Sequence, residues 1–237
     1  MTNHPRKRLL IVRVLHRHQI DDISLLAYDE SGSMSADWVA WELQADEYRL
    51  TRMHFDKGDV VIDIGAHIGL VSMYLAKRWP GITIYAFEPF PTNFRNCADS
   101  LVLNGVTNVV LSPVGIASCR RLLTMKTDAH NSGGASAIVR TFDSDLTASG
   151  VTAITLEEVF SMHQIRRCKL LKIDCEGMEY EILTGARVLE KVEYLAGEFH
   201  ASAYLQDRGW CPERLQAYCS SFFADGKMAI KFNEIPE

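Results

Sequence analysis

The chain has 237 residues, of which 47% are hydrophobic and 23% are charged, with a formal net charge of −5. This composition is typical of a globular chain that can bury a sizeable core without disulfides or a structural metal, and it argues against a disordered chain. The acidic balance argues against a protein whose main partner is the phosphate backbone of nucleic acid.

The first 58 residues are expected to form an arm and a small flanking or cap layer. Basic residues gather in the first twenty positions without an acidic one, and we interpret them as a solvated arm and edge strand, although they could also contact an anionic partner. The apolar run of residues 9–15 is too short to span a bilayer, and Arg13 interrupts it. It carries no signal-peptide cleavage pattern, so we expect a cytoplasmic protein. The six cysteines form no C-x-x-C pair, which indicates free thiols.

From residue 59 onward, short β-branched runs alternate with longer segments of helical period, as in parallel strands joined by helices. Strands are expected at residues 60–64, 82–87, 109–114, 170–174 and 194–200, and helices at 70–77, 94–103 and around 182–189. The predicted fold is α/β and Rossmann-like: a central, mostly parallel twisted sheet with helices on both faces and the N-terminal layer beside it. We assign residues 59–237 to this domain.

The alternation fails between residues 119 and 150, where we expect an insertion. A hairpin of residues 122–126 and 137–141 is expected to flank a turn-rich segment. Insertions of this kind often carry substrate loops, so His130 and Asn131 are candidates for substrate binding. Exposed loop residues more often have no function.

The residues from Asp63 to Gly69 predict a strand, a glycine turn and the start of a helix, and Glu88 ends the next strand. This layout can bind an adenosine, because backbone N–H groups face the ligand while the carboxylate accepts hydrogen bonds from the ribose hydroxyls. A dinucleotide fingerprint needs further glycines where this chain has Ala66 and His67. Side chains there obstruct a pyrophosphate but allow a ligand without phosphate, such as S-adenosylmethionine. The candidate cofactor residues are Asp63, Gly65, Ala66, His67, Gly69, Glu88, Val114 and Asp174.

Seven blocks follow one another between residues 57 and 200: VIDIGAHIG, YAFEPFPTNF, LVLNGV, VVLSPVGIAS, TLEEVF, LLKIDCEGMEYEILTGA and GEFH. In this order they resemble the FkbM-type S-adenosylmethionine-dependent methyltransferases. The resemblance implies a class I methyltransferase fold and methyl transfer, usually to a hydroxyl oxygen of a natural product or sugar. The chain departs from the family at His67, where Asn is common, and at Glu157, where Asp is common.

Polar side chains follow the last two predicted strands of this region, and they are the candidates for the chemistry of methyl transfer. We expect His200 to take the acceptor proton as a neutral imidazole, Asp174 to position the acceptor or the cofactor amino group, and Glu198 to assist. Glu176 is a candidate for acceptor binding, or a carboxylate that stabilises a helix N-terminus. A histidine bonded to a backbone carbonyl is an equal alternative for His200. Mg²⁺ or Mn²⁺ would suit these ligands, but without tight ligand spacing we predict no metal.

Two other functions remain open on the sequence alone. One is an NAD(P)-binding oxidoreductase or epimerase on a related fold, and the other is a methyltransferase-like domain that binds without turnover. The expected partner is a small-molecule or glycan acceptor, with neither nucleic acid nor a membrane span, and a homo-oligomer is compatible with the sequence. Motifs of serine hydrolases, zincins and P-loop NTPases do not occur.

Overall fold

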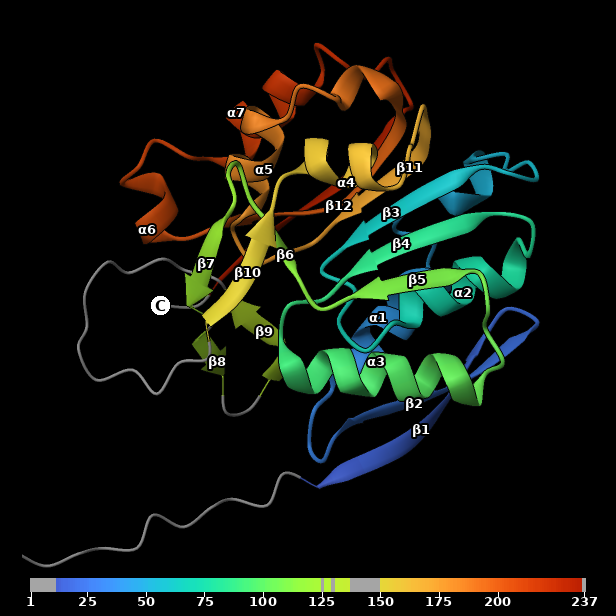
Figure 1. Ribbon diagram of the computed structural model, residues 1–237. Helices are drawn as coiled ribbons and strands as arrows, with labels where there is room; N and C mark the ends of the chain where they lie inside the picture. Colours follow the sequence, from blue (N-terminus) through green and yellow to red (C-terminus); the bar gives the residue numbers. More distant parts are fainter. Residues whose placement is uncertain (1–11, 125, 129–130, 137–149, 236–237) are drawn as a thin grey trace, which may run out of the picture.

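A computed structural model describes residues 12–124, 126–128, 131–136 and 150–235 (Figure 1). At its centre, six described strands form a sheet in which every neighbouring pair is parallel. The order is β13-β12-β11-β3-β4-β5, so the chain builds outward from β3 in one direction and later from β11 in the other. The α/β Rossmann-like fold is confirmed, with its topological switch point between β3 and β11. The strands are β3 (Val60–Ile64), β4 (Thr83–Phe87), β5 (Val109–Ser112), β11 (Cys168–Ile173), β12 (Val192–Ala201) and β13 (Met228–Glu234).

Helices cover both faces of the sheet, as expected (Figure 1). Successive strand residues point to opposite faces, so Ile62 and Leu171 join one hydrophobic cluster while Val61 and Leu170 join the other. The near-continuous apolar runs of the strands follow from this double burial. The first cluster packs under α4 (Leu156–Met162), α5 (Glu179–Gly185) and α7 (Pro212–Cys219), and the second under α1 (Ser35–Gln44), α2 (Leu70–Arg78) and α3 (Pro91–Leu103).

The N-terminal segment forms an antiparallel hairpin of β1 (Arg13–Ile20) and β2 (Ile23–Glu30) that packs on α3. The side chain of Asn104 completes the edge of β2: its Oδ1 accepts from the Leu26 N–H at 3.0 Å and its Nδ2 donates to the Leu26 carbonyl at 2.6 Å. Ser100 Oγ accepts from the Tyr28 N–H at 3.0 Å. Side chains of a helix therefore pair with a strand edge. Short helices complete the fold: η1 (Leu50–Arg52), η2 (Leu189–Lys191) and α6 (Ala203–Gln206).

The region after β5 differs from the prediction in two places. The strand expected at 109–114 ends at Ser112, because the chain leaves the sheet at Pro113, which cannot donate a ladder hydrogen bond. Of the expected hairpin, residues 137–141 lie outside the described residues, and Leu122 pairs with Thr152. The described strands here are β6 (Gly115–Ile116), β7 (Arg121–Thr124) and β10 (Gly150–Ile154) in one sheet, and β8 (Lys126–Asp128) with β9 (Asn131–Ser136) in another.

Within the described part of the chain, the helices are too short or too polar to cross a membrane.

Gly197 in the middle of β12 allows a test of how closely β12 approaches β11. Its φ is 137°, and a Cβ atom there would lie 1.8 Å from the carbonyl oxygen of Ile173 in β11. Backbone strain and overpacking together predict that Gly197→Ala lowers the free energy of unfolding by roughly 2–6 kcal/mol. Gly150→Ala is the control, since its Cβ would meet only Leu122 at 3.9 Å. Urea denaturation measures both variants, and equal stability of the two would contradict the close approach of β11 and β12.

Candidate active site

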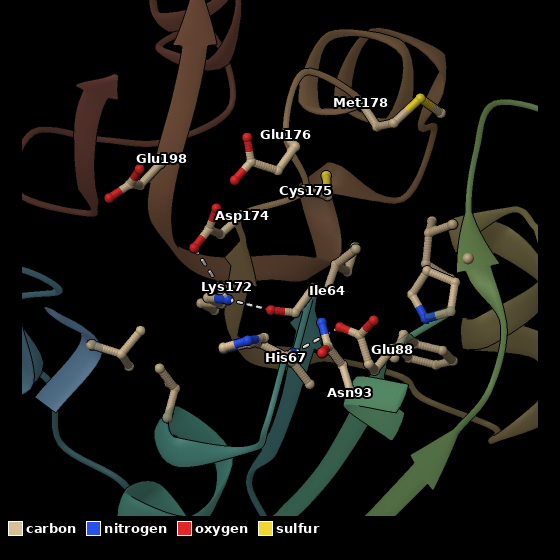
Figure 2. A pocket seen from close by; sticks show the side chains of 18 of the residues that line it. Ile64, His67, Glu88, Asn93, Lys172, Asp174, Cys175, Glu176, Met178 and Glu198 are labelled. Atoms are coloured by element: carbon tan, nitrogen blue, oxygen red, sulfur yellow. Dashed lines mark hydrogen bonds and ion pairs between the residues drawn. The ribbon is translucent and has the colours of Figure 1, made fainter. Parts of the chain in front are cut away.

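A cavity opens at the carboxyl ends of β3, β4, β11 and β12, around the topological switch point of the sheet (Figure 2). Polar groups enter it from the loops after these strands, and Trp38 and Val39 enter it from α1. Ligands collect at this position in open parallel sheets, because the strand ends and helix N-termini leave a crevice there. The cavity therefore lies where the sequence predicts a ligand.

The loop after β3 is held tightly against the loop after β11. Gly65 has a φ of 77°, and a Cβ atom there would lie 1.8 Å from the backbone oxygen of Asp174. The N–H groups of Gly65 and Ala66 both donate to the Phe87 carbonyl at 3.0 Å. His67 follows with a φ of 52°, a left-handed conformation that histidine adopts more readily than most side chains. Only glycine fits at position 65, which explains the turn.

Glu88, at the end of β4, faces this loop. One carboxylate oxygen accepts from the His67 N–H and the other from the Phe90 N–H, each at 2.8 Å. Burial raises the pKa of Glu88 to about 7, although both backbone hydrogen bonds and Lys172 oppose the rise. Each carboxylate oxygen accepts one backbone hydrogen bond and has a second lone pair for a ligand hydroxyl.

Lys172 in β11 lies beneath the loop and was not a candidate in the sequence. Its Nζ donates to the Gly65 carbonyl at 2.8 Å and lies 3.3 Å from Asp63 and 3.7 Å from Asp174. Burial opposes its charge, but Asp63 and Asp174 raise the pKa of the ammonium above its usual range. Asp63 is fully buried and also accepts from Ser72 Oγ at 2.6 Å. The lysine thus supports the loop after β3 through a buried ion pair with Asp63 and a hydrogen bond to Gly65.

On the opposite wall, carboxylates surround the ring of His200. Nδ1 lies 2.9 Å from a carboxylate oxygen of Glu179, which is itself fully buried. Nε2 lies 3.5 Å from Glu198, 3.7 Å from Glu176 and 3.9 Å from Asp174. Although burial lowers it, the pKa of His200 is raised to about 10 by the hydrogen bond and charge of Glu179 and by the charges of Glu176 and Asp174. The protonated imidazole offsets part of the negative charge of this wall.

The same residues are the set with which the described part of the chain could hold a metal ion. Ligand atoms of Asp174, Glu198 and His200 all lie within 4.8 Å of one another. Two carboxylates and an imidazole suit Mg²⁺ or Mn²⁺. Lys231 already pairs with Glu198 at 3.2 Å, and Asn233 donates to its other oxygen at 2.8 Å.

The structure brings most of the sequence candidates to one cavity. Eight of the candidates line the cavity: Gly65, Ala66, His67, Glu88, Val114, Asp174, Glu176 and Glu198. Asp63, Gly69 and His200 are not in the lining and lie behind it. His130 lies outside the described residues, and Asn131 belongs to β9, where the side chains are not described.

Further lining residues were missed by the sequence, among them Lys172, Asn93, Glu42, Tyr48 and Trp38. Lys172 carried a usable signal, since a lysine within an apolar strand is rarely buried unless it has a charged partner. Trp38 and Glu42 carried none, because nothing local places α1 beside the sheet.

The chain is similar to a family of methyltransferases and to several known members of that class. The sequence model of the methyltransferase FkbM domain matches residues 63–215. The 31-O-demethyl-FK506 methyltransferase FkbM of Streptomyces tacrolimicus is 26% identical, over 60% of this chain and 66% of its own length. The hexuronic acid methyltransferase AglP of Haloferax volcanii is 22% identical, over 69% of this chain and 65% of its own length. The chain thus spans just under two thirds of both relatives.

Among solved structures, a precorrin-6y C5,15-methyltransferase from Geobacter metallireducens is 18% identical, with a TM-score of 0.39. The alignment covers 65% of this chain and 57% of that chain.

The buried ion pair of Lys172 predicts a large effect on stability. Lys172→Met leaves the Asp63 carboxylate buried without its counter-charge, which costs about 3–5 kcal/mol of unfolding free energy. Arg167→Ala is the control, because its exposed pair with Glu193 contributes about 1 kcal/mol or less. Chemical denaturation measures both. The double variant Asp63→Leu/Lys172→Met should regain stability over Lys172→Met, and a Lys172→Met loss no larger than that of Arg167→Ala would contradict the assignment.

Proposed function

Because the chain belongs to the FkbM methyltransferase family, we propose that it transfers the methyl group of S-adenosylmethionine to a hydroxyl oxygen of a small molecule or glycan. The cofactor lies along the Gly65 to His67 loop and Glu88, and the acceptor lies toward Asp174. Methyl transfer from a sulfonium is an in-line displacement, so the protein contributes chiefly proximity and removal of the acceptor proton.

The observation that carries this proposal is the charge of the cavity. Among its described lining residues there are one ammonium, Lys172, and five carboxyl groups: Glu42, Glu88, Asp174, Glu176 and Glu198. Burial raises the pKa of Glu88 and of Glu176 to about 7, so these two are about half ionised at neutral pH, and the negative charges still outnumber the one ammonium. The sulfonium of S-adenosylmethionine is a cation and is favoured by such a wall, whereas the two negative charges of a dinucleotide pyrophosphate are disfavoured. The side chains of Ala66 and His67 add a steric obstacle to a pyrophosphate. The charge therefore supports a methyl donor over NAD or NADP.

Glu88 is suited to bind the ribose of this donor. Its two backbone hydrogen bonds fix the carboxylate plane, and its free lone pairs can accept from the two ribose hydroxyls. Burial also lowers the pKa of His67 to about 4, so the ring beside the cofactor stays neutral at physiological pH. A neutral ring adds no repulsion toward a cationic donor.

The carboxylate of Asp174 binds the acceptor hydroxyl and removes its proton, and His200 has a positioning role. Asp174 follows β11 directly, lines the cavity and is partly exposed, whereas the His200 ring is 2% exposed and lies behind the carboxylates. The His200 ring orients Asp174 and Glu198 from behind, and Glu179 fixes the ring. This arrangement revises the expectation that a neutral His200 takes the proton itself, and it needs no metal.

Isothermal titration tests the cofactor assignment. S-adenosylhomocysteine should bind, and NAD and NADP should not. Glu88→Ala should cost roughly 1.5–3 kcal/mol of binding free energy, the scale for losing hydrogen bonds to a charged group. The affinity of the wild type should rise as pH increases through about 7, because the ionised carboxylate is the better acceptor, and this rise should vanish in Glu88→Ala. The exposed Glu190→Ala is the control, and tight NAD binding without S-adenosylhomocysteine binding would refute the proposal.

Transfer of labelled methyl from S-adenosylmethionine into a small-molecule extract of the source cells tests the reaction. The product should be a methyl ether, which mild alkali does not cleave, rather than an alkali-labile methyl ester. Asp174→Asn should lower the rate by about 10²–10⁴-fold, the usual worth of a positioned base. EDTA should leave the rate unchanged. A loss of rate with EDTA that Mg²⁺ or Mn²⁺ restores would instead make Asp174, Glu198 and His200 metal ligands.

A further inference from the structure

We propose that the acceptor is a neutral, hydroxyl-bearing molecule with an apolar face, such as an uncharged glycoside, and that this face packs on Trp38 of α1. The inference rests on the proposed function and specifies the substrate class of the same site. Three features carry it: an exposed apolar stripe on α1, the continuity of that stripe with the cavity, and the charge of the surrounding wall.

The stripe consists of Met34, Trp38 and Trp41, whose exposed fractions are 62%, 61% and 53%. Their spacing of four and three residues places them on one side of α1. The two indole rings meet edge to face, with centroids 6.3 Å apart. Exposed apolar clusters of this kind on a soluble protein often mark an interaction surface.

Trp38 connects this stripe to the active site. It lines the same cavity as Asp174 and Glu88, together with Ser35 and Val39 of α1. The occupant of the stripe is therefore the molecule that enters the cavity beside the methyl donor, namely the acceptor.

A network of charges fixes α1 in this position. Glu42 of α1 accepts from the Tyr48 hydroxyl at 3.0 Å and pairs with Lys231 of β13 at 2.7 Å. Lys231 also lies 3.2 Å from Glu198. One ammonium thus joins the helix that carries Trp38 to a carboxylate of the acceptor wall, so the aromatic surface and the polar wall hold a set geometry.

The charge of the wall selects a neutral acceptor. Glu42, Asp174, Glu176 and Glu198 lie on this side, and they accept hydrogen bonds from hydroxyl groups but repel a carboxylate or phosphate. The nearby cations in the described residues are already engaged: Lys172 by Asp63 and the Gly65 carbonyl, and Lys231 by Glu42 and Glu198. The imidazolium of His200 is held behind the carboxylates by Glu179, at 2.9 Å from Nδ1.

An acceptor that fits both the apolar stripe and the carboxylate wall carries an apolar face on one side and hydroxyl groups on the other. The indole of Trp38 offers a large, rigid apolar surface to ring C–H groups, and the carboxylates bind the hydroxyls that remain.

A matched pair of probes tests this. Octyl β-D-glucopyranoside and octyl β-D-glucuronide differ only at C6, where the second carries a carboxylate. Titrated below their micelle concentrations into protein loaded with S-adenosylhomocysteine, the glucoside should bind about tenfold more tightly than the glucuronide. Trp38→Ala should weaken glucoside binding about tenfold, and Trp38→Phe should retain part of the affinity. Phe222→Ala, which removes an exposed aromatic outside the cavity lining, should change nothing.

The inference is overturned by glucuronide binding as tight as glucoside binding, by the absence of saturable glucoside binding, or by a glucoside affinity that Trp38→Ala leaves intact. Analytical sedimentation of the same variants measures their mass in solution and tests the alternative that a second copy of the chain occupies the stripe. If Trp38→Ala changes the mass in solution but not the glucoside affinity, the stripe binds a second copy of the chain. Failure of the proposed function is distinguishable, because S-adenosylhomocysteine itself then does not bind. Circular dichroism verifies that each variant is folded.

Discussion

The ammonium group of Lys172 joins β3 and β11 at the topological switch point of the sheet. It reaches from β11 to the carbonyl of Gly65 at the end of β3, and it neutralises Asp63 below and faces Asp174 beside it. The contact depends on the missing side chain of Gly65, since a Cβ atom would overlap the Asp174 backbone. The loop after β3 and the loop after β11 therefore have one shared support, and a shift of either loop would change the shape of the cavity between them.

The sequence could predict five of the six strands of the central sheet, the glycine turn and Glu88, because these signals lie in adjacent residues or follow from the rule that parallel strands end at one edge. It did not predict β13, the strand at the edge beside β12. It could not predict contacts made across long stretches of chain. Lys172 and Gly65 are 107 residues apart, and the pairing of Glu179 with His200 needs the turn of α5 against β12. The expected neutral His200 illustrates the limit: its charge depends on three acidic neighbours that only the fold assembles.

The N-terminal layer belongs to the active site as much as to the periphery. The boundary that we placed after residue 58 separates chain segments, yet the cavity draws on both sides of it, through Trp38 and Glu42 on one side and Glu198 on the other. Lys231, near the end of the described chain, connects the two. Residues from both sides of this boundary therefore line one cavity, so neither segment forms it alone.

The edge of β2 is completed by a side chain, that of Asn104, which is made much later during synthesis than β2 itself. The hairpin of β1 and β2 is made before Asn104, which lies 78 residues after its partner Leu26. At typical elongation rates this interval lasts roughly 4–16 s. A lone two-stranded hairpin is only marginally stable in water, so β2 presents an open edge throughout that time. The edge of β2 is consequently open to pairing with another strand until Asn104 is made.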